Sequence, residues 1–368
     1  MMKMAKYKLG DICEIVSGST PKTGIDEYWD GDIKWITPAE LNDDTYIITD
    51  SVRKITELAV KKTGLSSFPE GTVILSSRAP IGKVAIAGCE MYCNQGFKNL
   101  ICSEKINNKY LYWFLKGNTA YLNSLGRGAT FKEISKGIVS EIEINVPDID
   151  KQEEAVVTLE KVSEVIALRK KELSTLDDLI KARFVELFGV PIDNTKNWLM
   201  DKAENLCTLV TDGSHFSPKA CDEGYPMLSV KDMRQNGFDY SDCKLVDDET
   251  FEILKKQGCV PQVNDVLIAK DGSYFTRAFA ITEYKDQAIL SSIGMYRPDI
   301  DKILPRFLAS YLMMSEVIEF VNRGYVTGTA LRRVIIKGLK NIPVYIPPLE
   351  LQKEFVQFAN QVDKSKFV

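Results

Sequence analysis

Two short segments in the first half of the chain bring amide, hydroxyl and basic side chains close together. Their members are Ser77, Arg78, Lys83, Asn94, Gln95 and Lys98. Side-chain amides can pair with adenine edges, and lysine can bind guanine or a phosphate. These residue types therefore suit contact with nucleic acid, although an ordinary solvated loop explains any single member at least as well.

Basic residues recur at matching places elsewhere in the chain. A loop after a strand-like run in the second half holds Lys270, Tyr274 and Arg277. Basic turns also precede two helical segments, with members Arg127, Lys132, Arg323, Arg332 and Arg333. The recurrence favours a function for the whole set, so we predict that these residues contact nucleic acid.

No motif of a catalytic or cofactor site accompanies these residues. Gly82-Lys83 is followed by Val84 rather than Ser or Thr, so a phosphate-binding loop is not supported. No G-x-G-x-x-G pattern follows a strand, which leaves a dinucleotide or S-adenosylmethionine pocket without support. His215 is the only histidine, which excludes a histidine-rich metal site. We therefore expect a non-catalytic chain without cofactor or metal.

The composition narrows the class of protein further. The chain has 368 residues, with 47 Lys and Arg against 51 Asp and Glu and a net charge of −4. This acidic balance argues against a protein that coats nucleic acid by bulk charge. No stretch approaches the ~18 apolar residues of a membrane span. The N-terminus also lacks the apolar core of a signal peptide, so we expect a cytoplasmic protein that does not bind membranes.

An internal repeat organises the chain. The segment 146–156 reappears as 346–356, and 128–132 matches 328–332 at the same offset. Near the start, Cys13-Glu14-Ile15-Val16-Ser17 resembles Cys207-Thr208-Leu209-Val210-Thr211. Three matches in order at nearly constant offset indicate two copies of one unit.

Each copy begins with a mixed region of short strands. Runs 72–75 and 83–87 are strand-like and flank a turn at 78–82. Runs 265–269 and 278–281 repeat this arrangement around Asp271-Gly272-Ser273. One helix is expected to follow in each copy, over 108–125 and 305–322.

A long helix is expected after Pro147. Its apolar residues, spaced alternately by four and three, are Ala155, Leu159, Val162, Ile166, Leu173, Leu176, Ile180 and Leu187. Such a heptad stripe must be buried against another helix, and Arg169 and Arg183 interrupt it where they could set register or pair with an acid. We expect the second copy's helix, with Phe355, Ala359 and Val362, to cover the stripe in part. A helix of another protein is the alternative cover for the rest.

Several motifs occur together along the chain. They are Leu9-Gly10-Asp11, Ser17-Gly18-Ser19-Thr20-Pro21, Ser77-Arg78-Ala79-Pro80-Ile81-Gly82, Asn94-Gln95-Gly96-Phe97, Ala129-Thr130-Phe131-Lys132-Glu133-Ile134-Ser135 and a repeated Pro-x-x-x-x-Gln helix entry. Through these motifs and its two-copy layout, the chain resembles the specificity (S) subunit of type I restriction–modification enzymes over essentially its whole length.

The resemblance implies an α+β protein with two pseudo-repeated, mixed α/β target-recognition domains joined by long antiparallel, coiled-coil-like helices. The domains would span 1–148 and 191–347, with a spacer helix at 149–190 and a shorter distal helix at 348–368. Each domain would read one half of a bipartite double-stranded DNA site. The helices would set the spacing and dock the methyltransferase (M) and restriction (R) subunits.

Two other classes of protein remain open on the residues alone. One is a catalytic fusion that carries its own nuclease or methyltransferase activity, and the other is a repeat scaffold that does not bind DNA. Activity of the purified chain on DNA without partners would favour the first. Salt-sensitive DNA binding distinguishes a DNA reader from the scaffold.

Overall fold

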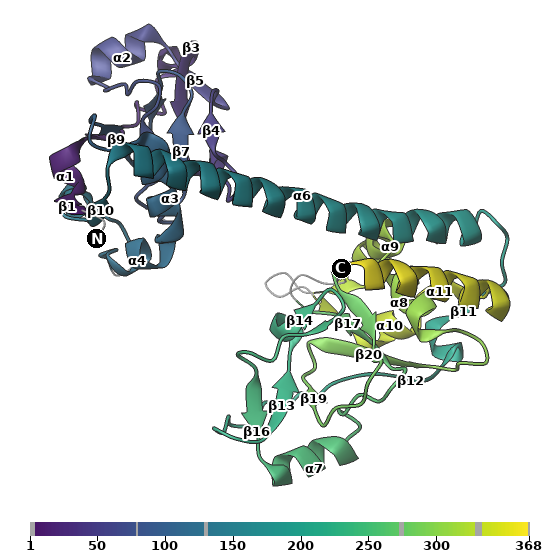
Figure 1. The fold of residues 1–368 in the computed structure, drawn as a ribbon. Helices are drawn as coiled ribbons and strands as arrows, with labels where there is room; N and C mark the ends of the chain where they lie inside the picture. The colour runs from purple at the N-terminus through teal and green to yellow at the C-terminus, as the bar shows by residue number, and fades with distance from the viewer. Residues whose placement is uncertain (1–3, 79, 129–131, 272–275, 328–332, 367–368) are drawn as a thin grey trace. The chain divides into compact units, whose positions relative to one another are not determined.

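The computed structural model describes residues 4–78, 80–128, 132–271, 276–327 and 333–366. The chain divides into two compact units, Met1–Leu168 and Arg169–Val368. Both units mix helices with small sheets, as expected (Figure 1). Among the described residues, no helix has the length and apolar character needed to cross a membrane.

The first unit is built around a five-stranded sheet. Its strand order is β2 (Cys13–Ser17), β9 (Phe97–Cys102), β6 (Val73–Ser76), β7 (Val84–Ala87) and β4 (Ile47–Ile48). A smaller sheet contains β5 (Arg53–Ile55), β3 (Trp29–Ile36) and β8 (Tyr92–Cys93), and β1 (Ala5–Lys8) pairs with β10 (Glu143–Val146). The helices before the long helix are α1 (Leu9–Ile12), α2 (Glu57–Thr63), α3 (Asn108–Gly117), α4 (Thr119–Ser124) and α5 (Lys136–Ser140).

The second unit repeats the central part of this sheet. Its four-stranded sheet has the order β12 (Cys207–Asp212), β20 (Ile293–Pro298), β17 (Val266–Ala269) and β18 (Ala278–Ala280). These strands pair antiparallel, as β2, β9, β6 and β7 do. Further strands are β11 (Met200–Lys202) with β23 (Pro343–Tyr345), and β13 (Tyr225–Leu228) between β16 (Lys244–Val246) and β19 (Ala288–Ile289). Two strand pairs remain, β14 (Met233–Arg234) with β15 (Gly237–Phe238), and β21 (Val326–Thr327) with β22 (Arg333–Val334).

The helix predicted after each sheet is in fact two helices. In the first unit α3 ends at Gly117 and α4 begins at Thr119; the Asn118 side chain donates a hydrogen bond to the Phe114 carbonyl, 2.7 Å away. In the second unit α8 (Pro305–Leu312) and α9 (Ser315–Gly324) are separated at Met314, which has an extended backbone and a side chain buried in the core. Tertiary packing therefore overrides the helical spacing at Met314, whereas the contact at Asn118 is local, within the preceding turn. The other helices are α7 (Asp248–Lys256) and α10 (Ile336–Lys340).

The Pro-x-x-x-x-Gln motif makes the same contacts in both repeats. The fully buried Gln152 side chain donates to the carbonyls of Lys105 and Pro147 and accepts from the Asn107 backbone N–H. The equally buried Gln352 bonds Lys302, Pro347 and Leu304 in the same way, at matching distances of 2.8–3.1 Å. Each glutamine thus ties the start of its helix to the loop before the domain's own helices.

The long helix α6 (Ile149–Phe188) is present, and Gly189, with φ of +79°, ends it. Within the second unit α6 packs against α11 (Leu349–Ser365), which runs alongside it in the opposite direction (Figure 1). Arg183 pairs with Glu354 at 2.5 Å, and Arg169 donates to the Lys366 carbonyl. The second copy's helix is therefore a partner of the stripe, as predicted, with Phe355, Ala359 and Val362 buried.

The spacing of the predicted heptad stripe is wrong at the end of α6. The residues of α6 buried most deeply in the second unit are Ile180, Phe184 and Phe188, which repeat every four residues. Phe184 and Phe188 lie outside the predicted stripe because the heptad spacing places Arg183 in the seam instead. In the first unit the stripe residues Leu159, Val162 and Ile166 are exposed, so cover by a helix of another protein stays a prediction.

Candidate nucleic-acid interface

A strand-end turn follows the central strand β6 or β17 of each repeat. It comprises Ser77-Arg78 in the first repeat and Lys270-Asp271 in the second. The Ser77 N–H donates to the Gly96 carbonyl at 2.7 Å, and the Lys270 N–H donates to the Ser292 carbonyl at 3.0 Å. The two turns thus start from equivalent backbone positions.

A second shared feature is a pair of facing backbone segments ahead of α5 or α10, which we term the basic hairpin; its described residues are 127–128 and 132–133 in the first repeat, and 327 and 333 in the second. In the first repeat the backbone groups of Arg127 and Glu133 bond each other at 3.0 and 2.9 Å. In the second, β21 and β22 pair Thr327 with Arg333. The Ile134 N–H donates to the Ser77 carbonyl, and the Val334 N–H to the Lys270 carbonyl, both at 2.9 Å. Each hairpin is therefore docked on its strand-end turn.

A group of charged side chains lies at this junction in each repeat, and we call it the charged node. In the first node one oxygen of Glu133 lies 2.8 Å from the Arg78 Nε, and the other lies 3.5 Å from the Lys98 Nζ. The Lys98 ammonium also donates to the Ser77 hydroxyl at 3.3 Å. Lys98 is 6% exposed, whereas the Arg78 side chain is 47% exposed.

The second node uses other residues. The Lys270 Nζ lies 3.1 Å from an Asp212 oxygen and 3.5 Å from Asp271, and Lys270 is 3% exposed. Arg333 reaches Asp271 at 3.9 Å. His215 is exposed, and its Nε2 lies 3.3 Å from Asp212. The charges at the junction are thus exchanged between the repeats. In the second repeat the turn residue Asp271 is acidic and the hairpin residue Arg333 is basic.

The predicted nucleic-acid residues fall into distinct environments. Those exposed on the described chain are Arg78, Gln95, Arg127, Lys132, Arg323 and Arg333. Gln95 accepts a hydrogen bond from Thr20, and Arg323 pairs with Glu319 on α9. Tyr274 and Arg332 lie outside the described residues.

The remaining predicted residues are buried or engaged within the fold. Ser77, Lys98 and Lys270 are buried in the nodes. The Lys83 ammonium donates to the carbonyls of Pro38 and Leu41 at 3.0 and 2.6 Å. Asn94 accepts a hydrogen bond from the Gly96 N–H, and Arg277 donates to the Met233 carbonyl at 3.0 Å. These groups hold loops in place in the described structure.

Sequence reasoning missed the acids of the nodes. Glu133 lies inside one of the motifs and Asp271 inside a turn, but neither has a partner that the sequence reveals. Asp212 is the last residue of β12, and its structural equivalent in the first repeat is Ser17 of β2. Ser17 pairs with Lys98 and Asp212 pairs with Gly294. This equivalence is the only signal that could have identified Asp212 as a member of the node. In the described part of the chain, no group of three or more His, Cys, Asp or Glu residues is placed to hold a metal ion.

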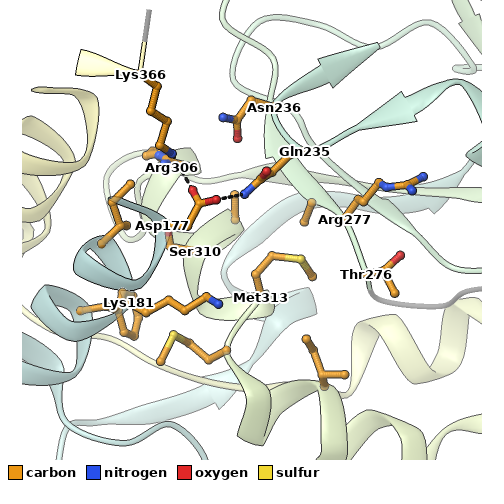
Figure 2. Close-up of a pocket in the computed structure, with 16 residues that line it drawn as sticks. Asp177, Lys181, Gln235, Asn236, Thr276, Arg277, Arg306, Ser310, Met313 and Lys366 are labelled. Atoms are coloured by element: carbon orange, nitrogen blue, oxygen red, sulfur yellow. Dashed lines mark hydrogen bonds and ion pairs between the residues drawn. The ribbon is translucent and has the colours of Figure 1, made fainter. Parts of the chain in front are cut away.

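A cavity of about 400 Å³ lies in the second unit between α6, α8 and the turn of the β14–β15 hairpin. Figure 2 shows Lys366 and Gln235 both directed at Asp177, with oxygen–nitrogen distances of 2.6 and 2.7 Å. Burial alone would raise the pKa of Asp177, but the hydrogen bonds from Lys366 and Gln235 hold that pKa below its ordinary value. Asp177 therefore connects α6 both to Lys366, directly after α11, and to Gln235 in the β14–β15 hairpin.

Comparison with known proteins identifies the family. The family model described as type I restriction modification DNA specificity domain matches residues 1–177 and 196–367. The MjaIX specificity subunit of Methanocaldococcus jannaschii is 41% identical over 197 residues, which are 53% of this chain and 43% of that protein. This chain thus spans less than half of that relative. The MjaVIII specificity subunit of the same organism is 22% identical over 97% of this chain and 85% of its own length.

A solved structure shares the fold. It comes from work on complex assembly and conformational transition of the type I R-M system. The match covers 99% of this chain and 90% of the chain in that structure, with a TM-score of 0.52 and 18% sequence identity. Two matches to one domain model agree with the repeated sheets, hairpins and glutamine contacts. The chain therefore belongs to the family of type I restriction–modification DNA specificity domains, of which it carries two copies.

Proposed function

We propose that this chain is the non-catalytic DNA-recognition subunit of a type I restriction–modification complex, and that each repeat reads one half of a bipartite duplex site. The observation that carries the proposal is the basic hairpin, docked by the same backbone bond on equivalent strands of both repeats. Two copies of one reading device suit a site made of two separated blocks.

The exposed cations and amide are assigned the direct contacts. In the first repeat these are Arg78, Gln95, Arg127 and Lys132, with Arg323 and Arg333 in the second. Arginine and lysine contacts to phosphates position a protein on DNA, whereas contacts to base edges specify the sequence. Asn94, Arg277, Tyr274 and Arg332 remain proposed contacts, while Ser77, Lys83, Lys98 and Lys270 are assigned to holding the loops.

The long helices are assigned the spacing of the two blocks and the docking of the M and R subunits. The first half of α6 supports docking because it exposes several apolar side chains. They are Val157, Leu159, Val162, Val165, Ile166 and Leu168. Apolar patches of this kind mark protein interaction sites. Action on chromosomal DNA would place the complex in the cytoplasm.

Selection from a library of randomised duplexes tests the proposal. The full-length chain should enrich two short sequence blocks separated by a constant unspecified spacer. Lys132→Ala should weaken the block read by the first repeat, by about 1–3 kcal/mol for a base contact, or reduce the salt slope by about one for a phosphate contact. Lys61→Ala is a matched control, since Lys61 is an exposed lysine on α2 paired with Glu57.

The activity assignment has its own test. The chain alone should neither methylate nor cut DNA, and addition of an M subunit should start S-adenosylmethionine-dependent methylation at the enriched site. Turnover by the chain alone would instead support a catalytic fusion. Absence of any enriched block, together with binding that does not respond to salt, would support a scaffold.

A further inference from the structure

Each repeat buries one lysine at the junction of sheet and hairpin, but from a different position in the fold. Lys98 lies on β9, whereas Lys270 follows β17. The position equivalent to Lys98 is Gly294, since each lies one residue after the first residue of its strand and faces β6 or β17 respectively. The position equivalent to Lys270 is Ser77. Both repeats therefore place a lysine ammonium at the junction, but the two lysines occupy non-equivalent positions.

The second repeat is tightly packed at the position where the first repeat has its lysine. A Cβ atom on Gly294 would lie 2.7 Å from a methyl carbon of Leu339 and 3.1 Å from Ile268. Leu339 and Ile268 belong to the packed core of the second unit. A lysine at Gly294 would disturb this packing, and the cation of the second node comes instead from Lys270, directly after β17.

The acids that pair with the two lysines also come from different positions in the two repeats. The hairpin supplies the acid Glu133 in the first repeat, whereas β12 and the turn supply Asp212 and Asp271 in the second. In both repeats the hairpin residue and the turn residue carry opposite charges and form an ion pair, Glu133 with Arg78 and Arg333 with Asp271. A buried ammonium is costly unless paired, so each set of partners depends on the whole of its node.

We infer that the charged nodes are positioning devices: Lys98 with Glu133, and Lys270 with Asp212 and Asp271, fix the basic hairpin on the strand-end turn so that its exposed cations meet DNA. The inference rests on the proposed function and assigns roles within the same site. Lys98 and Lys270 act through their acids and do not themselves touch the duplex. Each node serves only the block read by its own repeat.

Library selection with the full-length chain tests the first node, with the block of the first repeat identified by its loss in Lys132→Ala. Glu133→Gln leaves the buried Lys98 ammonium without its carboxylate and should weaken binding of that block about tenfold, which corresponds to ~1.4 kcal/mol. The double variant Lys98→Met with Glu133→Gln removes both charges and should restore binding to within about threefold of wild type, because no unpaired buried charge is left. The salt slope of the double variant should equal that of wild type.

The second node provides the matched experiment. Asp212→Asn should weaken only the other block, and adding Lys270→Met should restore it. Glu141→Gln is the control for loss of an ordinary pair, since Glu141 and Lys8 form an exposed ion pair at 2.6 Å, and it should change neither block. Retention of the opposite block reports that the unaltered repeat is folded, and restored binding in the double variant reports that the altered repeat is folded.

Three results would overturn the inference. One is a double variant at least as weak as its single acid variant, which would mean that the lysine contributes directly. Another is a salt slope reduced by about 0.9 when Lys98 is removed, the value for one phosphate contact. The third is equal loss of both blocks from one node. A wild-type chain that enriches no block overturns the proposed function itself, and the inference with it.

Discussion

Glu133 and Arg333 stand at the same place in the two repeats, at the end of the basic hairpin, and carry opposite charges. The neighbouring turn residue carries the complementary charge in each repeat, since Arg78 lies beside Glu133 and Asp271 lies beside Arg333. By contrast, Gln152 and Gln352 make the same three hydrogen bonds. The comparison teaches that the scaffold tolerates exchange of charges as long as every buried charge keeps a partner, whereas the entry to the helix admits one solution.

The two halves of α6 provide the sharpest contrast. Phe184 is fully buried among aromatic rings of the second unit, stacked on Phe307 at 5.3 Å between ring centroids. We expect Phe184→Ala to destabilise the second unit by about 3–5 kcal/mol, because it removes a large buried side chain. Ile166→Ala, on the exposed half, should change stability by no more than about 0.5 kcal/mol. Thermal melting of the full-length chain measures both, and equal effects would contradict the difference in cover.

A second comparison concerns the buried glutamines. Gln152→Met and Gln352→Met each keep the volume but leave buried backbone groups without partners, at about 1–3 kcal/mol for each group. Because the hydrogen bonds match, the two variants should lose similar amounts of stability. Denaturant unfolding, followed with a probe in each unit, provides the measurement. A loss in one repeat more than about twice that in the other would mean that the helix entries are not equivalent.

The smallest expected effect concerns a contact of the first repeat alone. Glu160 on α6 accepts hydrogen bonds from the Tyr46 hydroxyl at 2.5 Å and from Lys109 at 3.0 Å. The hydrogen bond from Tyr46, followed by that from Lys109, lowers the pKa of Glu160. A lowered folded-state pKa stabilises the protein above the unfolded pKa, about 4.3, and this contribution is lost as the pH falls through the folded value.

Glu160→Gln should therefore cost less than ~1 kcal/mol at neutral pH, and the difference from wild type should close as the pH falls below about 4. The equivalent position of the second repeat is Asn360, which is exposed. Asn360→Ala is the control and should show no such pH dependence. Melting temperatures across the pH range test this, and a difference that persists at low pH would mean that the Glu160 charge is not the cause.

Local pattern is sufficient to predict much of the fold. Apolar runs predict β6, β7, β17 and β18, and the offset of 200 residues predicts the repeat. The break at Met314 could not be predicted, because packing of this residue in the core of the second unit decides it. Lys98 was expected at the surface, but its strand β9 lies between β2 and β6 in the sheet, where the side chain is buried. The partner acid Glu133 is 35 residues away, and no local pattern reports a contact at that separation.

The charged nodes also constrain how genes of this kind can exchange parts. Residues 99–132 separate Lys98 from Glu133, so a recombination event between the two repeats within that stretch would join the lysine of the first repeat to the hairpin of the second. A crossover within that stretch would pair Arg78 and Lys98 with the arginine of the second repeat, which places three cations at one junction and no acid. Viable hybrids should therefore have their crossover points beyond the hairpin, in the segment that leads into the long helix, so that a recognition module is inherited together with its own counter-charge.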